Sequence, residues 1–271
     1  MNKLVLMDLD LTLIDRGYNL TVPLDQIRPV VAAAKMRGIT MGLNSDSPYE
    51  SLRRWYDSLG LNGPIISERG ARVYLPDWPT PIDFSSPGAS LFPRLREDFI
   101  KNLPSVCSHV LCGDANNLQA QPRPDPVGDK FIIVNAYRER SISFFARQVG
   151  PDGKLIAEPD LLKKAASLLN DLAQKYPLLW EERDIDDNPD YCIYIMHSRI
   201  SQKHSTVVRL LNEFNLEQLW MVGDNLPDFI DDLRVNHVAV ANARDTFKAK
   251  AKIITAKPIT EGVLEFLEAL A

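Results

Sequence analysis

The sequence has few cysteines and no excess of positive charge. Its cysteines form an odd, sparse set of three, Cys107, Cys112 and Cys192, which predicts reduced thiols and not a disulfide scaffold. With a formal net charge of −5, the chain has no general attraction for nucleic acid or for an anionic membrane surface. An anionic ligand would therefore need positive groups that are placed locally.

Long apolar runs are also missing. No apolar run reaches the roughly 18 residues of a membrane-spanning helix, and the N-terminus lacks the apolar stretch of about 7–15 residues that marks a secretory signal. These absences predict a cytoplasmic protein with neither a membrane nor a nucleic-acid partner. Cys107, His109 and Cys112 lie close together, but no second Cys/His cluster accompanies them, so we expect ordinary core or loop residues there.

Both ends of the chain alternate between expected strands and expected helices. Short apolar runs alternate with amphipathic segments up to about residue 75 and again after residue 200. This alternation predicts an α/β fold with a doubly wound, Rossmann-like parallel sheet and helices on both faces. The expected strands are 3–7, 39–43, 64–67, 71–75, 219–222, 237–242 and 252–256, and helices are expected to begin near Asp25, Ser47, Ser201 and Gly262.

The middle of the chain differs from its two ends in composition and in the order of its expected elements. Two proline-rich stretches, "LPDWPTPIDFSSPG" and "QPRPDPVGD", accompany the strand candidates "FIIVNAY", "SISFFARQ" and "YCIYIM" and a helix over 160–176. We therefore predict an inserted α+β unit over residues 77–199, and a core built from residues 1–76 and 200–271. Four polar residues of the inserted unit could reach a ligand, with a solvated surface as the alternative: Arg138, Arg140, Arg147 and Asp190.

Acidic and hydroxyl side chains gather where the expected parallel strands end. In open α/β sheets, ligands bind at the carboxyl ends of the strands. Lys203 lies in the first turn of an expected helix and could join the same edge. The strand-end residues are Asp8, Asp10 and Thr12, then Asn44, Ser45, Asp46 and Ser47, then Gly223, Asp224, Asn225 and Asp228.

Carboxylates and a lysine at one sheet edge favour phosphate chemistry. Three or four carboxylates call for a hard cation such as Mg²⁺, whereas hydroxyls, a lysine and a helix N-terminus suit a phosphate. Phosphoryl transfer through an aspartyl-phosphate would use both. Simpler interpretations stay open for single residues, because Asp8 could be an ordinary loop or capping residue. Ser47 is expected to cap a helix, which leaves Ser45 as the better phosphate donor.

At these positions the sequence resembles the haloacid dehalogenase (HAD) superfamily of phosphohydrolases. The stretch "DLDLTL" matches the first motif, Asp-x-Asp-x-Thr-(Leu/Val), in full. Ser45, Lys203 and "GDNLPD" match the second, third and fourth motifs in family order. The large insertion between the second and third motifs is similar to the α/β cap of the Cof-type branch, which includes sugar-phosphate phosphatases and eukaryotic-type phosphomannomutase.

The resemblance implies a magnesium-dependent phosphatase that acts on a small phosphorylated metabolite, such as a sugar phosphate or a related phosphoester. Asp8 would be the nucleophile and Asp10 the general acid and base. The phosphate-binding set would be Thr12, which also supports the loop around Asp10, with Asn44, Ser45 and Lys203. The ligands of Mg²⁺ would be Asp8, the backbone carbonyl of Asp10, Asp224 and Asp228.

Three positions depart from the family pattern. Many relatives have Thr-Gly-Arg where this chain has "SDS" from Ser45, so an arginine is missing and an acid stands nearby. Pro227 stands where many relatives have asparagine. Arg69 replaces a common asparagine and could supply part of the missing positive charge.

Two alternatives therefore remain beside the phosphatase. One is a phosphosugar mutase of the phosphomannomutase type, which shares the cap and the motifs. The other is a non-catalytic phosphometabolite-binding protein, which the departures at Ser47 and Pro227 motivate. The presence of both Asp8 and Asp10 argues for an enzyme.

Overall fold

Residues from both ends of the chain form one structural unit. The computed structural model describes residues 3–120, 124–176, 181–186, 192–200, 202–216 and 218–270. Contacts divide the chain into one unit of residues 1–84 with 201–271 and a second unit of residues 85–200. No described helix is long and apolar enough to cross a membrane.

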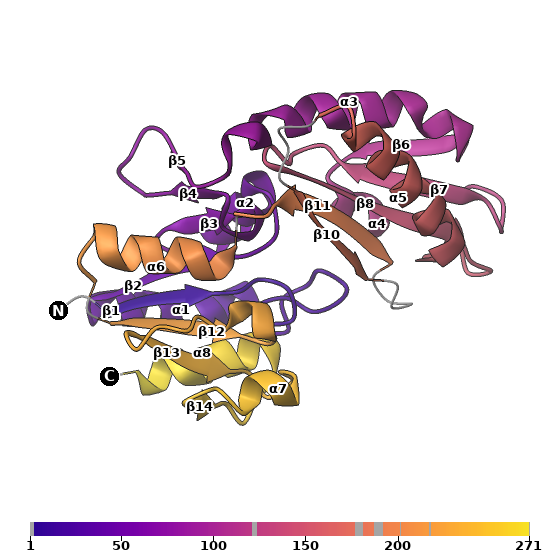
Figure 1. Ribbon diagram of the computed structural model, residues 1–271. Helices are drawn as coiled ribbons and strands as arrows, with labels where there is room; N and C mark the ends of the chain where they lie inside the picture. Colours follow the sequence, from indigo (N-terminus) through magenta and orange to yellow (C-terminus); the bar gives the residue numbers. More distant parts are fainter. Residues whose placement is uncertain are drawn as a thin grey trace. The chain divides into compact units, whose positions relative to one another are not determined.

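An eight-stranded sheet runs through the first unit (Figure 1). Its strands are β1 (Lys3–Met7), β2 (Ile39–Asn44), β3 (Ile65–Ser67), β4 (Arg72–Tyr74), β5 (Ile82–Asp83), β12 (Leu219–Gly223), β13 (Val235–Ala239) and β14 (Ile253–Ile254). The spatial order is β14-β13-β12-β1-β2-β3-β4-β5. Neighbours from β14 to β3 are parallel, and β4 and β5 are added antiparallel at one edge. The predicted parallel-sheet α/β core is confirmed.

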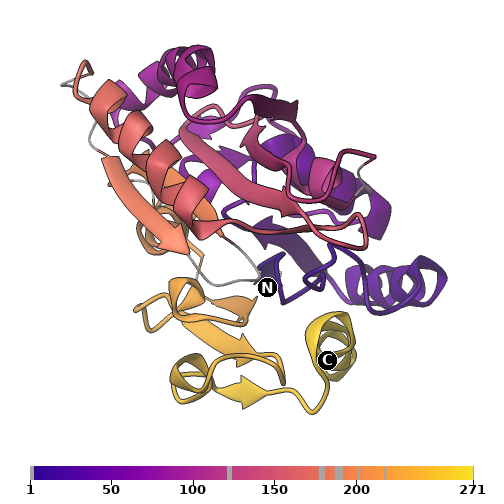
Figure 2. The same ribbon diagram turned by 90° about the vertical axis from the view of Figure 1, so that its right-hand side faces the viewer.

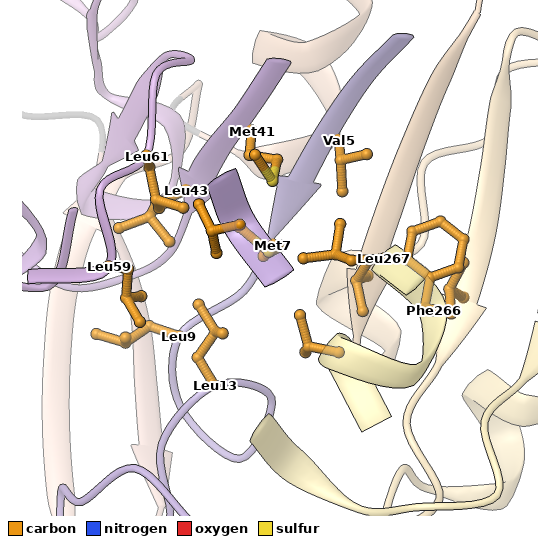
Figure 3. Packing of buried hydrophobic residues seen from close by; sticks show 14 of the residues in the cluster. Val5, Met7, Leu9, Leu13, Met41, Leu43, Leu59, Leu61, Phe266 and Leu267 are labelled. Carbon is orange, nitrogen blue, oxygen red and sulfur yellow. The ribbon is translucent and has the colours of Figure 1, made fainter. Parts of the chain in front are cut away.

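Helices cover both faces of this sheet, which explains why β1 is apolar throughout. Val5 and Met7 face the cluster that includes Leu267 (Figure 3), whereas Leu4 and Leu6 face the cluster that includes Val207. The first face is covered by α1 (Leu24–Met36), α2 (Tyr49–Leu59) and α8 (Ile259–Ala269), and the second by α6 (Lys203–Glu213). A short helix, α7 (Asp245–Lys248), follows β13.

Element boundaries differ in places from those expected. The sheet extends through β5 past the expected core limit at residue 76, and β14 keeps only two of the five residues expected for it. The helices expected to begin near Asp25 and Ser47 begin at Leu24 and Tyr49, with Pro23 and Pro48 as their N-caps. Ser201 lies outside the described residues, and the N-cap of α6 is Gln202.

The second unit is a mixed sheet with helices on both faces (Figures 1 and 2). Its strands are β6 (His109–Gly113), β7 (Lys130–Asn135), β8 (Ser141–Val149), β9 (Leu155–Ala157), β10 (Glu181–Asp186) and β11 (Ile193–Ser198). They lie in the order β10-β11-β8-β7-β6, with β9 beside β8, and only the β6–β7 pair among these described strands is parallel. One face is covered by α3 (Phe92–Asn102) and α5 (Pro159–Ala173), and the other by α4 (Ala115–Ala120).

Gly42 in β2 generates a prediction about packing in the first unit. A Cβ atom there would lie 2.2 Å from the backbone oxygen of Pro64, which cannot move without disturbing the β2–β3 register. We expect Gly42→Ala to lower the free energy of unfolding by about 3 kcal/mol, as overpacking does. Gly60→Asn is the control, because Gly60 has open space and asparagine tolerates its φ of 71°. Urea unfolding measures both, and equal stabilities of the two variants would contradict the prediction.

Candidate active site

Asp8 is placed by the centre of the parallel sheet. It follows β1 directly, and its backbone N–H still donates to the carbonyl of Val222 at 3.0 Å, as in a continued strand. Its side chain is buried. The next residue, Leu9, points into the apolar cluster on one face of the sheet (Figure 3). Because successive side chains of a strand point to opposite sides, the Asp8 carboxylate is kept apart from the apolar cluster that Leu9 enters.

The chain turns back sharply after Leu9. The backbone N–H groups of Leu13 and Ile14 both donate to the carbonyl of Leu9, at 2.9 and 3.0 Å, and Leu11 adopts a left-handed φ of 60°. Two side chains from distant segments hold the loop, because Asn242 donates to the Leu11 carbonyl and Thr260 to the Leu13 carbonyl. The loop that carries Asp10 and Thr12 is thus fixed from outside itself.

Lys203 joins two of the predicted acids. Its Nζ atom donates to Oδ1 of Asp8 at 2.6 Å and to Oδ1 of Asp228 at 2.8 Å. All three side chains are buried. Charge-assisted hydrogen bonds of this length are among the strongest in proteins, and each carboxylate needs one where water is excluded. The structure therefore brings the first-motif aspartate, the lysine and the last acid of "GDNLPD" into one cluster.

Asp228 is oriented by the backbone that precedes it. Its Oδ2 atom accepts the N–H groups of Asp224 and Asn225, at 3.1 and 3.3 Å. Gly223 makes this approach possible, because a Cβ atom there would lie 2.3 Å from Oδ2 of Asp228. With Oδ2 held by amides, Oδ1 is left to face Lys203. Pro227 sits in this turn without disturbing the hydrogen bonds, since the amides used are those of residues 224 and 225.

Two histidines fix the segment after Asp228, and they were not predicted from the sequence. Nε2 of His237 in β13 accepts the N–H of Ile230 at 3.0 Å, and Nδ1 of His204 in α6 accepts the N–H of Asp231 at 3.2 Å. Helix α6 thus holds this segment through two successive residues, Lys203 and His204. The available signal was that the chain has four histidines and one of them follows Lys203.

Three buried carboxylates form a potential cation site. Atoms of Asp8, Asp224 and Asp228 all lie within 4.8 Å of one another, and no other such group of His, Cys, Asp or Glu occurs in the described parts of the chain. Oxygen-only ligands of this kind fit Mg²⁺. Within the described residues, the Cys107 Sγ atom donates to the carbonyls of His109 and Lys130, at 3.4 and 3.2 Å.

Burial and mutual repulsion perturb the titration of this cluster. Burial raises the pKa of Asp8 well above its usual value, repulsion from Asp228, Asp224 and Asp10 adds to this, and Lys203 opposes it. Burial and then Asp228 raise the pKa of Asp224 to about 7. Burial alone would lower the pKa of Lys203, but Asp228 and Asp8 raise it well above its usual value. Burial thus keeps the pKa values of Asp8 and Asp224 raised even beside the Lys203 ammonium, which favours a bound cation.

The remaining predicted residues lie at the same sheet edge but differ in their contacts. Asp10 is half-buried, and its charge acts on both Asp8 and Asp224. Thr12 and Asn44 are fully buried, and within the described chain Thr12 Oγ1 and Asn44 Oδ1 make no hydrogen bond. Through those atoms they therefore form no hydrogen bond with Lys203 or with the acids.

Ser45 lies at the end of β2, buried among backbone hydrogen bonds. Its N–H donates to the carbonyl of Ile66 at 3.0 Å, and its Oγ accepts the N–H of Ser47 at 3.2 Å. Ser47 makes no side-chain capping bond to α2, so the expectation that it caps this helix is wrong. The proline at position 48 takes the N-cap place and moves the helix start by one residue.

The polar residues of the second unit have structural partners within it. Arg138 donates to Oγ of Ser141 at 2.9 Å, and Nε of Arg147 donates to Oε1 of Gln119 at 2.8 Å. Both arginines are buried, so they are not the solvated surface residues of the alternative interpretation. Arg140 donates to the carbonyl of Glu139, and Asp190 lies outside the described residues.

Comparison with known proteins agrees with the motif analysis. The family model of the haloacid dehalogenase-like hydrolases matches residues 143–267, which include Lys203 and the acids of "GDNLPD". The match confirms the resemblance, and the hydrolase class, that the four motifs predicted. No sequence among the curated proteins matches the chain.

Several solved structures share the fold along the whole chain. A haloacid dehalogenase-like hydrolase from Bacteroides thetaiotaomicron has 17% identity and a TM-score of 0.66, with 100% of both chains covered. TM0651 from Thermotoga maritima has 16% identity and a TM-score of 0.62, covering 100% of this chain and 98% of its own. The HAD subclass IIB sugar phosphatase BT4131 has 15% identity and a TM-score of 0.57, with 98% of both chains covered. At these identities the likeness shows the HAD-like fold with its inserted unit.

The raised pKa of Asp224 predicts how stability depends on pH and metal. Without metal, the folded protein keeps a proton on Asp224 up to about pH 7, whereas an unfolded aspartate releases it near 3.8. The contribution of Asp224 to the free energy of unfolding is therefore fully present below about pH 4 and is lost as the pH rises through 7. The loss is at most about 4 kcal/mol, at about 1.4 kcal/mol per pH unit. In EDTA we expect the melting temperature to fall between pH 5 and pH 8, and Mg²⁺ to restore it at pH 8.

Asp224→Asn is the matched variant for this experiment. This variant should show a smaller fall of the melting temperature in EDTA and a smaller recovery in Mg²⁺, because the titrating group and one metal ligand are gone. A change in melting temperature from pH 5 to pH 8 that is the same in Asp224→Asn and in the parent chain, or a melting temperature that ignores Mg²⁺, would count against the cluster as described.

Through His237 the stability of the fold should depend on pH in the opposite direction. Burial lowers its pKa, so below about pH 6.5 the unfolded chain takes up a proton that the folded chain resists. Stability should fall as the pH drops from 7.5 to 5, measured by urea unfolding in excess Mg²⁺. His237→Gln keeps an acceptor for Ile230 and should flatten this fall. His237→Leu should cost about 1–2 kcal/mol at pH 7.5, because a buried N–H is left unpaired. Equal stability of these two variants would refute the role of the hydrogen bond.

Proposed function

We propose that this chain, which resembles the haloacid dehalogenase-like hydrolases at four sequence motifs, is a magnesium-dependent phosphatase of a small phosphorylated metabolite. The observation that carries the proposal is the contact of Asp8 with Lys203 inside the buried cluster that includes Asp224 and Asp228. A nucleophilic carboxylate, a cation for the phosphoryl oxygens and ligands for a metal are the three parts that hydrolysis through an aspartyl-phosphate needs.

The proposed reaction has two steps. In the first, a carboxylate oxygen of Asp8 forms a bond to phosphorus while the bond from phosphorus to the leaving oxygen breaks. Asp10 donates a proton to that oxygen, which leaves as an alcohol. In the second, Asp10 takes a proton from water, whose oxygen attacks phosphorus, and the bond to Asp8 breaks to release phosphate. Asp10 thus returns to its acid form at the end of each cycle.

Lys203 contributes positive charge where negative charge grows. Its ammonium lies 2.6 Å from Asp8, close enough to contact a phosphoryl group on that carboxylate. The hydrogen bond also favours the ionised form of Asp8, which burial opposes. Asp8, the Asp10 carbonyl, Asp224 and Asp228 would hold Mg²⁺, which when bound supplies a Lewis acid and screens the repulsion between the acids. Ser45, Thr12 and Asn44 would complete the phosphate-binding set.

A sugar phosphate or a related phosphoester is the proposed substrate class. The HAD subclass IIB sugar phosphatase BT4131 and a trehalose-6-phosphate phosphatase-related protein share the fold, and their names support this choice. The second unit would act as the cap that selects the substrate.

The nucleophile assignment predicts the effect of one substitution. Asp8→Asn should lower phosphate release by more than about 10³-fold, because an amide cannot form the aspartyl-phosphate. The variant should fold normally, since its amide oxygen can still accept from Lys203 and one repelling charge is gone. Phosphate release is measured over a panel of phosphorylated metabolites with Mg²⁺.

Asp25→Asn, at an exposed position of α1, is the matched control and should keep full activity. Turnover by a folded Asp8→Asn variant at the parental rate would exclude the proposal. Conversion of a sugar 1-phosphate to its 6-phosphate without net phosphate release would instead favour the mutase.

A further inference from the structure

The turn that carries Asp10 is held by a side chain that lies 231 residues away in the sequence. Within the turn, backbone N–H groups donate to the carbonyl of Leu9. The carbonyl of Leu11, the residue after Asp10, instead accepts Nδ2 of Asn242 at 2.8 Å. Leu11 itself has a left-handed φ of 60°, which side chains other than glycine rarely adopt. A backbone of this kind persists only where the surroundings enforce it, and Asn242 contributes to that.

Asn242 contacts a second left-handed residue with its other amide atom. Its Oδ1 atom accepts the N–H of Ile259, the first residue of α8, at 2.8 Å. The φ of Ile259 is 48°, and a β-branched side chain makes this conformation rarer still. One side chain therefore donates to the turn and accepts from the helix. An amide can do both from separate atoms, whereas a carboxylate only accepts.

The same segment of the chain also contacts Asp224. The N–H of Arg244, two residues after Asn242, donates to the Asp224 carbonyl at 2.8 Å. Residues 240–244 therefore contact both the turn that carries Asp10 and the strand end that carries Asp224. If the Asn242 contact were lost, the turn would be released on this side while the backbone of Asp224 stayed held.

We propose that Asn242 is a positioning residue, which fixes Asp10 by holding the carbonyl of Leu11. The inference rests on the proposed function for the role of Asp10 as acid and base. Asp8 does not depend on this contact, because it continues β1 and its N–H donates to Val222 in the neighbouring strand. Loss of the contact should therefore disturb the proton transfers by Asp10 more than the attack by Asp8.

Asn242→Asp separates the two contacts of this side chain. The carboxylate still accepts the N–H of Ile259 and suits the N-terminus of α8, but it cannot donate to the Leu11 carbonyl. Because Asn242 is exposed, the new charge is not buried. The variant should therefore unfold at about the same urea concentration as the parent chain. Asn242→Ala loses both contacts and should unfold at a lower concentration.

The kinetic test uses 4-nitrophenyl phosphate and the full chain in Mg²⁺. The phenolate leaves with the electron pair of its broken bond to phosphorus and needs little protonation, so the first step depends only weakly on Asp10. Attack by water on the aspartyl-phosphate still needs Asp10 as the base. In Asn242→Asp, about one equivalent of phenolate per chain should form at nearly the parental rate. Later turnovers should be about 10²-fold slower, as misplacement of a catalytic group costs.

Amide hydrogen exchange tests the same contact without any substrate. In Asn242→Asp, the N–H groups of Leu13 and Ile14 should exchange faster, because the turn that holds them is released, whereas those of α8 should keep the parental rate. Asn102→Asp is the control, because Nδ2 of Asn102 in α3 likewise donates to a carbonyl, that of Asp98, at 2.8 Å. The control should change neither the exchange of the turn nor the later turnovers.

Two results would overturn the proposal. One is parental exchange of the turn in Asn242→Asp, and the other is a first and later turnovers that slow alike, as they would if the whole site were distorted.

The two proposals can fail separately. Faster exchange in Asn242→Asp, with no phosphoester cleaved by the parent chain, would remove the phosphatase and keep Asn242 as the residue that holds the turn. Cleavage that depends on Asp8, with later turnovers of Asn242→Asp at the parental rate, would do the reverse.

Discussion

The buried ammonium of Lys203 is the interaction on which the rest of the site depends. It links the end of β1 to the turn after β12 through Asp8 and Asp228, and these two segments lie 195 and 25 residues from it in the sequence. Three carboxylates within 4.8 Å would otherwise repel each other with little water to screen them. The tight turn at Gly223, the amides that hold Asp228 and the histidine-held segment after it all serve to keep this geometry.

Much of the fold follows from simple patterns. The apolar run of β1 predicts a strand buried on both faces, and the structure places Val5 and Leu6 in the clusters on opposite faces. Alternation of strands and helices predicts the parallel sheet. In the second unit, β6, β9, β10, α3 and α4 were not predicted. For β6 the reason is that it is only partly buried and its sequence "HVLCG" lacks a clear alternation of apolar and polar residues.

The candidate site, too, was only partly predictable from the sequence. That Asp8, Asp224, Asp228 and Lys203 would share one sheet edge followed from strand ends and motif order, because topology alone brings them together. The roles of His204 and His237 did not follow. They depend on hydrogen bonds from backbone N–H groups that lie 27 and 7 residues away in the sequence. No local pattern of residue types encodes such a contact.

The insertion of residues 85–200 between β5 and α6 has a consequence for biosynthesis. The strand that carries Asp8 leaves the ribosome early, but Lys203 and the strand β12 that pairs with β1 are made about 200 residues later, roughly 10–40 s at usual rates. During that interval one side of β1 has no partner, and the acids have no ammonium. The inserted unit, whose sheet pairs only with itself, can complete its own fold meanwhile. Catalytic competence would then be among the last properties that a newly made chain acquires.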